Sequence, residues 1–190
     1  MRFIIAGLCI LLLASCSNEK DIIVEDQLEK VTHVEGQPTN IKESEIQKGS
    51  FTLTLKSEKD QYKVGEDLNI VAQLTYHGEK AIHIRYAGSW VSLGTTNLTK
   101  NYQFGSSMFL ANSTTPLASG ETISEQYQYT GGLYVEELGG NPYSEDENSK
   151  MSKMNFPPGQ YKIEAHTDFK NEDNGIPYKI HTAIIFKVVE

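Results

Sequence analysis

Two histidines near the C-terminus have the spacing best suited to metal chemistry. In the segment Tyr161–Phe169 apolar and polar side chains alternate, and His166 falls on the polar face. His181 has the matching parity in the segment that follows. A hairpin that pairs Asp168 with Lys179 would therefore place the two histidines directly opposite each other. Two imidazoles with a nearby carboxylate can hold a divalent transition metal.

The commoner outcome for such a pair is two solvated imidazoles beside a surface ion pair. A shift of the strand register by one residue would also separate the two rings. We therefore predict no metal site, with the His166–His181 pair as the alternative. A second pair, His77 and His83, flanks a turn that carries Glu79 but offers no clear third ligand.

Other catalytic constellations find little support. No serine lies in a Gly-x-Ser-x-Gly turn, and the Gly-Gly pairs lack the lysine and the serine or threonine of a phosphate-binding loop. Residues 168–175 resemble a calcium loop but lack its ligand spacing and its terminal glutamate. We predict no catalytic residues, no cofactor and no enzymatic activity.

Tyrosines give the better indication of a binding surface. The chain has ten tyrosines, several of them in or beside the stretch 131–158. Tyrosine suits recognition because it combines a rigid contact area with a hydroxyl group. The candidate binding residues are Tyr129, Tyr134 and Tyr143. The competing interpretation is that these are strand and core residues, since strands favour tyrosine.

The stretch 130–158 is long for a loop in a compact domain, and such loops are uncommon unless they are functional or disordered. Part of it has the pattern of a short helix. Ser144 and Glu147 have the spacing of a capping box at a helix N-terminus. Met151 and Met154, three residues apart, would share one helix face, which we expect to pack against the rest of the domain.

Short strands separated by turn residues account for most of the remaining chain. Alternating apolar side chains predict strands over 51–56, 68–76, 81–86, 90–93, 102–110, 122–129, 160–169 and 177–189. Helical periodicity is almost absent. This pattern predicts an all-β fold, an antiparallel sandwich or barrel.

The N-terminus has the features of an export signal. Arg2 is followed by an apolar or small run, Phe3–Ala14, which is too short for the roughly 20 residues of a membrane-spanning helix. Such a run is typical of a secretory signal peptide. It ends in Leu13-Ala14-Ser15-Cys16, which resembles the lipobox of bacterial lipoproteins. The resemblance implies cleavage before Cys16 and a lipid anchor, including an acyl chain such as palmitate, on that cysteine.

These features divide the chain into three parts. We expect a signal peptide over 1–15, a flexible polar tether over 16–49 and a β-sandwich domain over 50–190. Cys9 leaves with the signal peptide, so Cys16 is the last cysteine and the domain has no disulfide. Its own hydrophobic core must hold it together.

Charge narrows the range of partners. The formal net charge is −8, and loss of Arg2 with the signal peptide makes it −9. Nucleic-acid binding needs a basic surface, and Arg85 is the only arginine left. An acidic domain is also repelled by anionic lipid, so membrane contact should run through the lipid anchor. Solubility alone is the simplest reason for the acidity.

Three short turn segments of the sequence resemble those of known protein families. They are Tyr62-Lys63-Val64-Gly65-Glu66, Leu117-Ala118-Ser119-Gly120-Glu121 and Phe156-Pro157-Pro158-Gly159-Gln160-Tyr161. Together they resemble the immunoglobulin-like domains of bacterial surface proteins. They are also similar to the Bacillus intracellular proteinase inhibitors and to uncharacterised lipoproteins of that genus. The resemblance implies an immunoglobulin-like sandwich, but no residue matches the reactive segment of the inhibitors.

The sequence therefore predicts a lipid-anchored protein on the extracytoplasmic face of a bacterial membrane. We expect a non-enzymatic binding module for a protein, a cell-wall component or a small ligand, with the 131–158 stretch as the contact region. A protease inhibitor is the alternative function.

Overall fold

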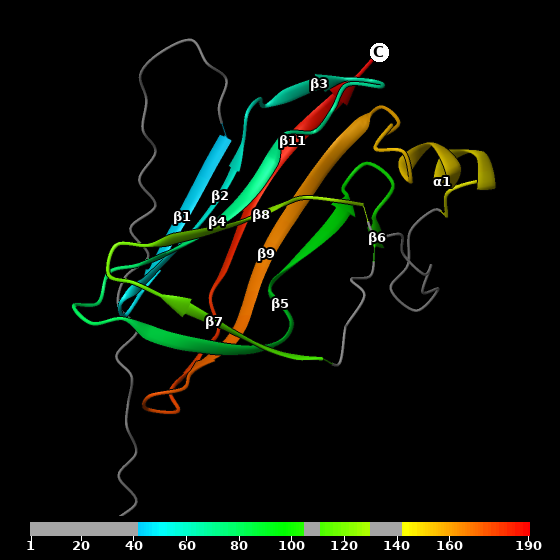
Figure 1. Ribbon diagram of the computed structural model, residues 1–190. Helices are drawn as coiled ribbons and strands as arrows, with labels where there is room; N and C mark the ends of the chain where they lie inside the picture. The colour runs from blue at the N-terminus through cyan, green and yellow to red at the C-terminus, as the bar shows by residue number, and fades with distance from the viewer. Residues whose placement is uncertain (1–41, 105–110, 130–141) are drawn as a thin grey trace, which may run out of the picture.

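The computed structural model describes residues 42–104, 111–129 and 142–190, which form two packed β-sheets and one short helix (Figure 1). In chain order the elements are β1 (Lys42–Lys48), β2 (Phe51–Ser57), β3 (Gln61–Lys63), β4 (Ile70–Tyr76), β5 (Ile82–Asn97), β6 (Tyr102–Phe104), β7 (Asn112–Leu117), β8 (Thr122–Gln126), α1 (Glu145–Met151), β9 (Gly159–Asn171), β10 (Pro177–Tyr178) and β11 (His181–Val189).

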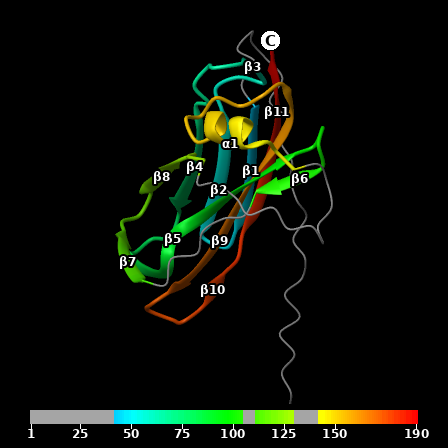
Figure 2. The same ribbon diagram turned by 90° about the vertical axis from the view of Figure 1, so that its right-hand side faces the viewer.

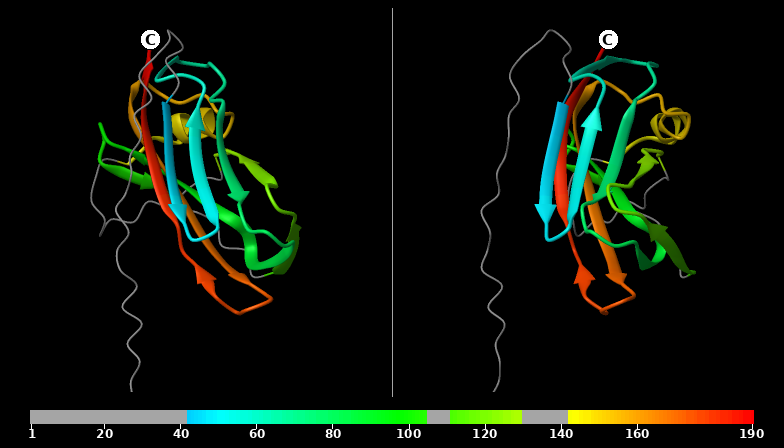
Figure 3. Two further views of the ribbon diagram at one scale, coloured as in Figure 1. Left: turned by 90° about the vertical axis from the view of Figure 1, so that its left-hand side faces the viewer. Right: turned by 60° about the vertical axis from the view of Figure 1, so that its left-hand side comes forward.

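The strand order is that of an immunoglobulin-like sandwich. One sheet has the order β1-β2-β4-β8, and the other has the order β3-β11-β9-β5-β6, with β7 paired to β5 and β10 to β9. Figure 3 shows the layer of β1, β2 and β4 lying over the layer that contains β9 and β11. The strands β2, β4 and β8 correspond to A, B and E of the immunoglobulin fold, and β5, β9 and β11 to C, F and G. The predicted all-β sandwich is confirmed.

The core fills the space between the sheets. Alternating residues of β2 and β4 face the alternating residues of β9 and β11, and side chains such as Leu53, Leu74, Ile163 and Phe186 are at most 1% exposed. Burial of these apolar side chains is the main source of stability, because the described strands contain no disulfide.

Two further features match the immunoglobulin pattern. Trp90 on β5 is buried, as is the core tryptophan of strand C in antibody domains. Tyr161, near the start of β9, donates a hydrogen bond from its hydroxyl to the backbone carbonyl of Pro157, 2.7 Å away. A tyrosine at the start of strand F that bonds back to the preceding corner is the tyrosine corner of this fold.

The folded domain begins earlier than expected. Strand β1 (Lys42–Lys48) lies inside the range 16–49 that was predicted as a tether, and it pairs with β2 across the two-residue loop Gly49–Ser50. Gly49 adopts a positive φ of 59°, which glycine tolerates without steric cost. The strand escaped prediction because Ile46 is its only apolar residue. Residues 1–41, with the predicted signal peptide and most of the tether, lie outside the described residues.

Region 81–117 also differs from the prediction. The two strands expected at 81–86 and 90–93 are one strand, β5, with an irregular pairing to β9 between Tyr86 and Val91. Pro116 lies in β7, an edge strand that no predicted strand covers, where a missing N–H is tolerated. Of the strand expected at 102–110, the structure describes β6; residues 105–110 lie outside the described residues.

Candidate functional site

Three metal-ligating side chains meet on the outer face of the second sheet. His181 of β11 pairs directly with His166 of β9, so the hairpin has the register that places the two histidines opposite each other. Glu164 lies two residues before His166 on β9 and therefore points to the same face. One donor atom from each of the three side chains lies within 4.8 Å of the others. Within 42–104, 111–129 and 142–190 this is the one such group of three, and its burial ranges from half-buried to exposed.

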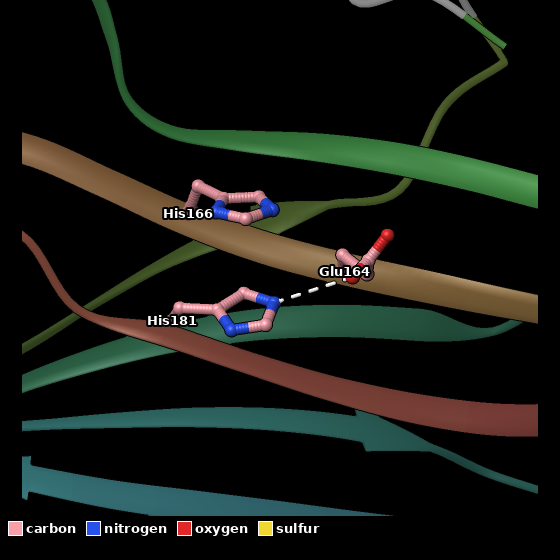
Figure 4. Close-up of side chains that lie close together, drawn as sticks. All are labelled: Glu164, His166 and His181. Carbon is pink, nitrogen blue, oxygen red and sulfur yellow. Dashed lines mark ion pairs between the residues drawn. The ribbon is translucent and has the colours of Figure 1, made fainter. Parts of the chain in front are cut away.

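The two imidazoles lie against each other. Their ring centroids are 4.2 Å apart and their planes are inclined by 18°, so the rings are stacked. His181 Nε2 lies 3.4 Å from Glu164 Oε1. Figure 4 shows both rings extending along the strands toward the Glu164 carboxylate, with the His181 contact drawn as a dashed line. The ring nitrogens and the carboxylate therefore face a common region above the sheet.

Charged neighbours flank the group. Lys162 Nζ lies 3.0 Å from Glu164 Oε1, and Lys179 Nζ lies 3.4 Å from Asp168 Oδ2 at the far side of the histidines. Partial burial, together with the facing His181, lowers the pKa of His166. His166 therefore favours the neutral imidazole, which is the form that binds metals.

Small residues surround Glu164 on the sheet surface. On β5, Gly94 pairs with Glu164 and Ser92 pairs with His166; on β11, Ala183 pairs with Glu164. A side-chain carbon added at Gly94 would meet no atom within 4 Å, so the surface beside the carboxylate is open. The side chains of His181 and Glu164 are 51% and 20% exposed. The group is therefore accessible from solvent.

The second histidine pair does not form a site with Glu79. His77 Nε2 lies 2.8 Å from the Thr52 hydroxyl on the other sheet, and His83 lies on the exposed side of β5. Neither histidine belongs to the three-ligand group found in the described residues.

Tyr143 is a core residue, which corrects its predicted role in binding. Its ring is 7% exposed and packs against Tyr102 and Phe104, with centroid separations of 5.1 and 5.4 Å. The Asn97 side-chain amide donates a hydrogen bond to its hydroxyl, and burial raises the pKa of Tyr143. The ring is thus enclosed and its hydroxyl is satisfied.

Of the other two candidates, Tyr129 is half-buried against Phe104 and Phe156, and Tyr134 lies outside the described residues. Tyr129 therefore keeps part of its surface available. Its packing partners explain why tyrosines concentrate here: they form an aromatic layer at this end of the core.

The predicted helix is present. In α1, Ser144 and Glu147 form both hydrogen bonds of a capping box. Met151 is fully buried and Met154 is partly buried against the core, as predicted. Lys100 Nζ lies 2.8 Å from Glu147 Oε1 and ties the helix to the turn after β5. This bond lowers the pKa of the Glu147 carboxyl. Figure 2 shows α1 packed outside the two sheet layers.

Cys16, the predicted lipidation site, lies outside the described residues. Among the residues that are described, no helix has the length and apolar character to cross a membrane.

No family model and no curated protein sequence matches the chain. Its structure is weakly similar to a β-glucosidase from Listeria innocua in complex with gluconolactone, with a TM-score of 0.36 and 13% identity. That match covers 79% of this chain and 16% of the β-glucosidase. A protein from Archaeoglobus fulgidus is similar with a TM-score of 0.33 and 10% identity, over 79% of this chain and 96% of that one. At these TM-scores neither likeness indicates a shared activity.

Proposed function

We propose that the protein is a lipid-anchored module on the extracytoplasmic face of a bacterial membrane, where it binds a partner and catalyses no reaction. The observation that carries this proposal is the lipobox-like Leu13-Ala14-Ser15-Cys16 at the end of a short apolar run. A β-sandwich follows it, and the first strand that the structure describes in it is β1 (Lys42–Lys48). One fold can host many functions, so the β-sandwich does not itself indicate an activity. The proposed location rests on the N-terminal sequence, and the proposed binding role rests on the surface of the domain.

The character of the surface supports a binding role. One open hollow of about 580 Å³ follows the turn around β3, with Lys59, Gln61 and Glu66 among its lining residues. A smaller hollow of about 230 Å³ lies over Lys56 and Val71. Neither lining brings a serine or cysteine together with a histidine, one of the pairs used in nucleophilic catalysis.

We place the recognition surface at the end of the sandwich that carries α1. The seven-residue helix α1 lies between two sandwich strands in the chain and is fixed by a capping box, by buried Met151 and by the Lys100–Glu147 ion pair. Long loops between the strands of a compact domain are commonly functional. The outward face of α1 carries an exposed ion pair, Asp146–Lys150.

The anchor is tested by changing each cysteine separately. Cys16→Ser should abolish incorporation of labelled palmitate and release the domain from the membrane fraction. Cys9→Ser is the matched control, since it keeps an apolar-or-small run and should leave both readouts unchanged. Equal membrane retention of both variants would refute lipid anchoring at Cys16.

The recognition surface is tested by charge exchange, with crosslinking and capture from intact cells. Exchanging the pair at α1 (Asp146→Lys with Lys150→Asp) keeps opposite charges at positions i and i+4 but reverses the pattern that a partner meets. The same exchange at Asp168 and Lys179 is the control, because that pair is similarly exposed and belongs to the β9–β10 hairpin. Figure 1 shows the turn of this hairpin at the end of the sandwich away from α1. We expect the first exchange to lose a captured partner that the second retains. Identical captures would exclude the α1 face.

The alternative function is that of a protease inhibitor, because the three turn segments are similar to those of the Bacillus proteinase inhibitors. This alternative predicts that the purified protein inhibits a bacterial serine protease stoichiometrically and stays uncut in the complex. Rapid cleavage without inhibition would dismiss it.

A further inference from the structure

We infer that Glu164, His166 and His181 form a surface site that binds one divalent transition-metal ion, Zn²⁺ or Cu²⁺. The inference is independent of the proposed function, since it concerns the outer face of β9 and β11 and neither Cys16 nor α1.

The donor set selects the class of metal. Two imidazole nitrogens and one carboxylate oxygen suit zinc, copper and nickel, whereas calcium and magnesium require shells of oxygen ligands. Three protein ligands leave at least one coordination position for water or for a donor group of a partner.

The backbone already holds the three ligands in place. His166 and His181 are direct cross-strand partners, and β9 is an inner strand with β11 on one side and β5 on the other. The ladder of hydrogen bonds therefore fixes the register that brings the ligands together. Only side-chain rotation remains to be adjusted.

That adjustment is small. With metal–ligand bonds of about 2.0–2.2 Å, tetrahedral ligands lie roughly 3.4 Å from one another. The Glu164 Oε1 to His181 Nε2 separation is already 3.4 Å. The stacked rings, with centroids 4.2 Å apart, must tilt so that their nitrogens converge. His166 and His181 are exposed, so their rings can turn without disturbing the core.

Lys162 competes with the metal for the carboxylate. Its ammonium lies 3.0 Å from Glu164 Oε1 and must move away when a cation binds. The Lys162 side chain is 32% exposed and can turn toward solvent, and ion pairs near the surface contribute little to stability. Gly94, Ser92 and Ala183 leave the space above the carboxylate free of bulky side chains.

The test is a calorimetric titration of the purified full chain in detergent with ZnCl₂. We expect saturable uptake of one Zn²⁺ per chain at this site. His166→Ala and His181→Ala should each weaken it by at least about tenfold, since loss of supporting residues around a metal site already costs that much. Lys162→Met should tighten it, because the competing ammonium is gone. His83→Ala, an exposed histidine of the same sheet, is the matched control and should leave the affinity unchanged.

A spectroscopic readout identifies the ligands directly. With Cu²⁺ as the probe, electron paramagnetic resonance should show coupling to two imidazole nitrogens in the wild type and to one in His181→Ala. The His166→Ala and His181→Ala variants should melt at the wild-type temperature without metal, because the replaced side chains are exposed. No Zn²⁺ uptake by the wild type, or equal affinity in the wild type, His166→Ala and His181→Ala, would overturn the inference.

Discussion

The two faces of strand β9 carry polar side chains in different environments: one face is buried in the core and the other is open to solvent. Tyr161 points into the core, is fully buried, and donates its hydroxyl hydrogen to Pro157. His166, five residues on, points outward, where it stacks on His181 near the Glu164 carboxylate. The inner group has a fixed partner, and burial raises its pKa. The outer groups can exchange their contacts for a ligand.

In this domain the face of the strand on which a side chain lies, more than its residue type, determines whether it stabilises the core or is free to bind a ligand. A tyrosine enclosed with its hydroxyl satisfied contributes to stability, because an unpaired buried polar group would be costly. An exposed histidine contributes little to stability and is therefore free for another role.

The largest effect is expected from Tyr143→Ala. Removing a buried aromatic ring from the layer formed with Tyr102 and Phe104 should cost about 3–5 kcal/mol of unfolding free energy, measured by urea denaturation. Tyr143→Phe keeps the ring and should cost much less. His181→Ala on the outer face should change stability by less than about 0.5 kcal/mol. A similar loss of unfolding free energy for Tyr143→Ala and His181→Ala would contradict the difference between buried and exposed side chains.

Zinc should stabilise the protein through the outer cluster. A ligand that binds only the folded state adds about 2.7 kcal/mol at a concentration one hundred times its Kd. We expect Zn²⁺ to raise the melting temperature of the wild type, and EDTA to reverse the increase. The double variant His166→Ala with His181→Ala should show no increase; an equal increase would place the stabilising zinc elsewhere.

Tyr161→Phe should have an intermediate effect. The variant keeps the ring but leaves the Pro157 carbonyl without the hydroxyl donor now 2.7 Å away. We expect a loss of about 1–2 kcal/mol in the same denaturation experiment. An unchanged stability would mean that water replaces the hydroxyl at this corner.

The smallest effect is expected from Glu147→Gln and depends on pH. The hydrogen bond from Lys100 lowers the folded-state pKa of Glu147 below its ordinary 4.5. The ionised carboxylate therefore stabilises the fold above that pH, and the contribution disappears as pH falls through the lowered value.

At pH 7 the variant should lose less than about 1 kcal/mol, since helix caps and partly exposed ion pairs contribute on this scale. The difference from the wild type should narrow as the pH falls below 4.5. Lys153→Gln, which removes an exposed lysine just after the helix, is the control and should show no such narrowing. If the difference in stability between the variant and the wild type is the same at every pH, the effect comes from replacing the capping carboxylate by an amide. The charge of the Glu147 carboxylate would then not contribute.

The sequence predicted those parts of the fold where alternation was strong. Both strands of the β9–β11 hairpin were expected with the correct inward-facing residues, because apolar residues such as Ile163 and Ile184 alternate cleanly with polar ones. Alternation alone left the register between the two strands open, and the structure has the register that pairs His166 with His181. Strand β1 was missed, since an edge strand needs few apolar side chains. The join of two predicted strands into β5 was missed because its irregular pairing with β9 interrupts the alternation between Tyr86 and Val91.

The site was predicted in part. Register alone brought the two histidines together, but the choice of Glu164 over Asp168 as the third ligand depends on side-chain rotation, which periodicity does not encode. Asp168 is paired instead with Lys179. For Tyr143 the sequence left a binding role and a core role open, because a tyrosine in a long loop gives no sign of whether its ring folds back onto the core; the structure has it in the core.

The parallel pairing of β3 with β11 has a consequence for the order in which the chain folds. β11, the last strand of the chain, lies between β3 and β9, so Lys187 must meet Gln61 before the second sheet is complete. Contacts between such distant parts of a chain form slowly. The second sheet therefore cannot be completed until β11 has been synthesised. A chain that must pass through a secretion channel in extended form would gain time from this delay.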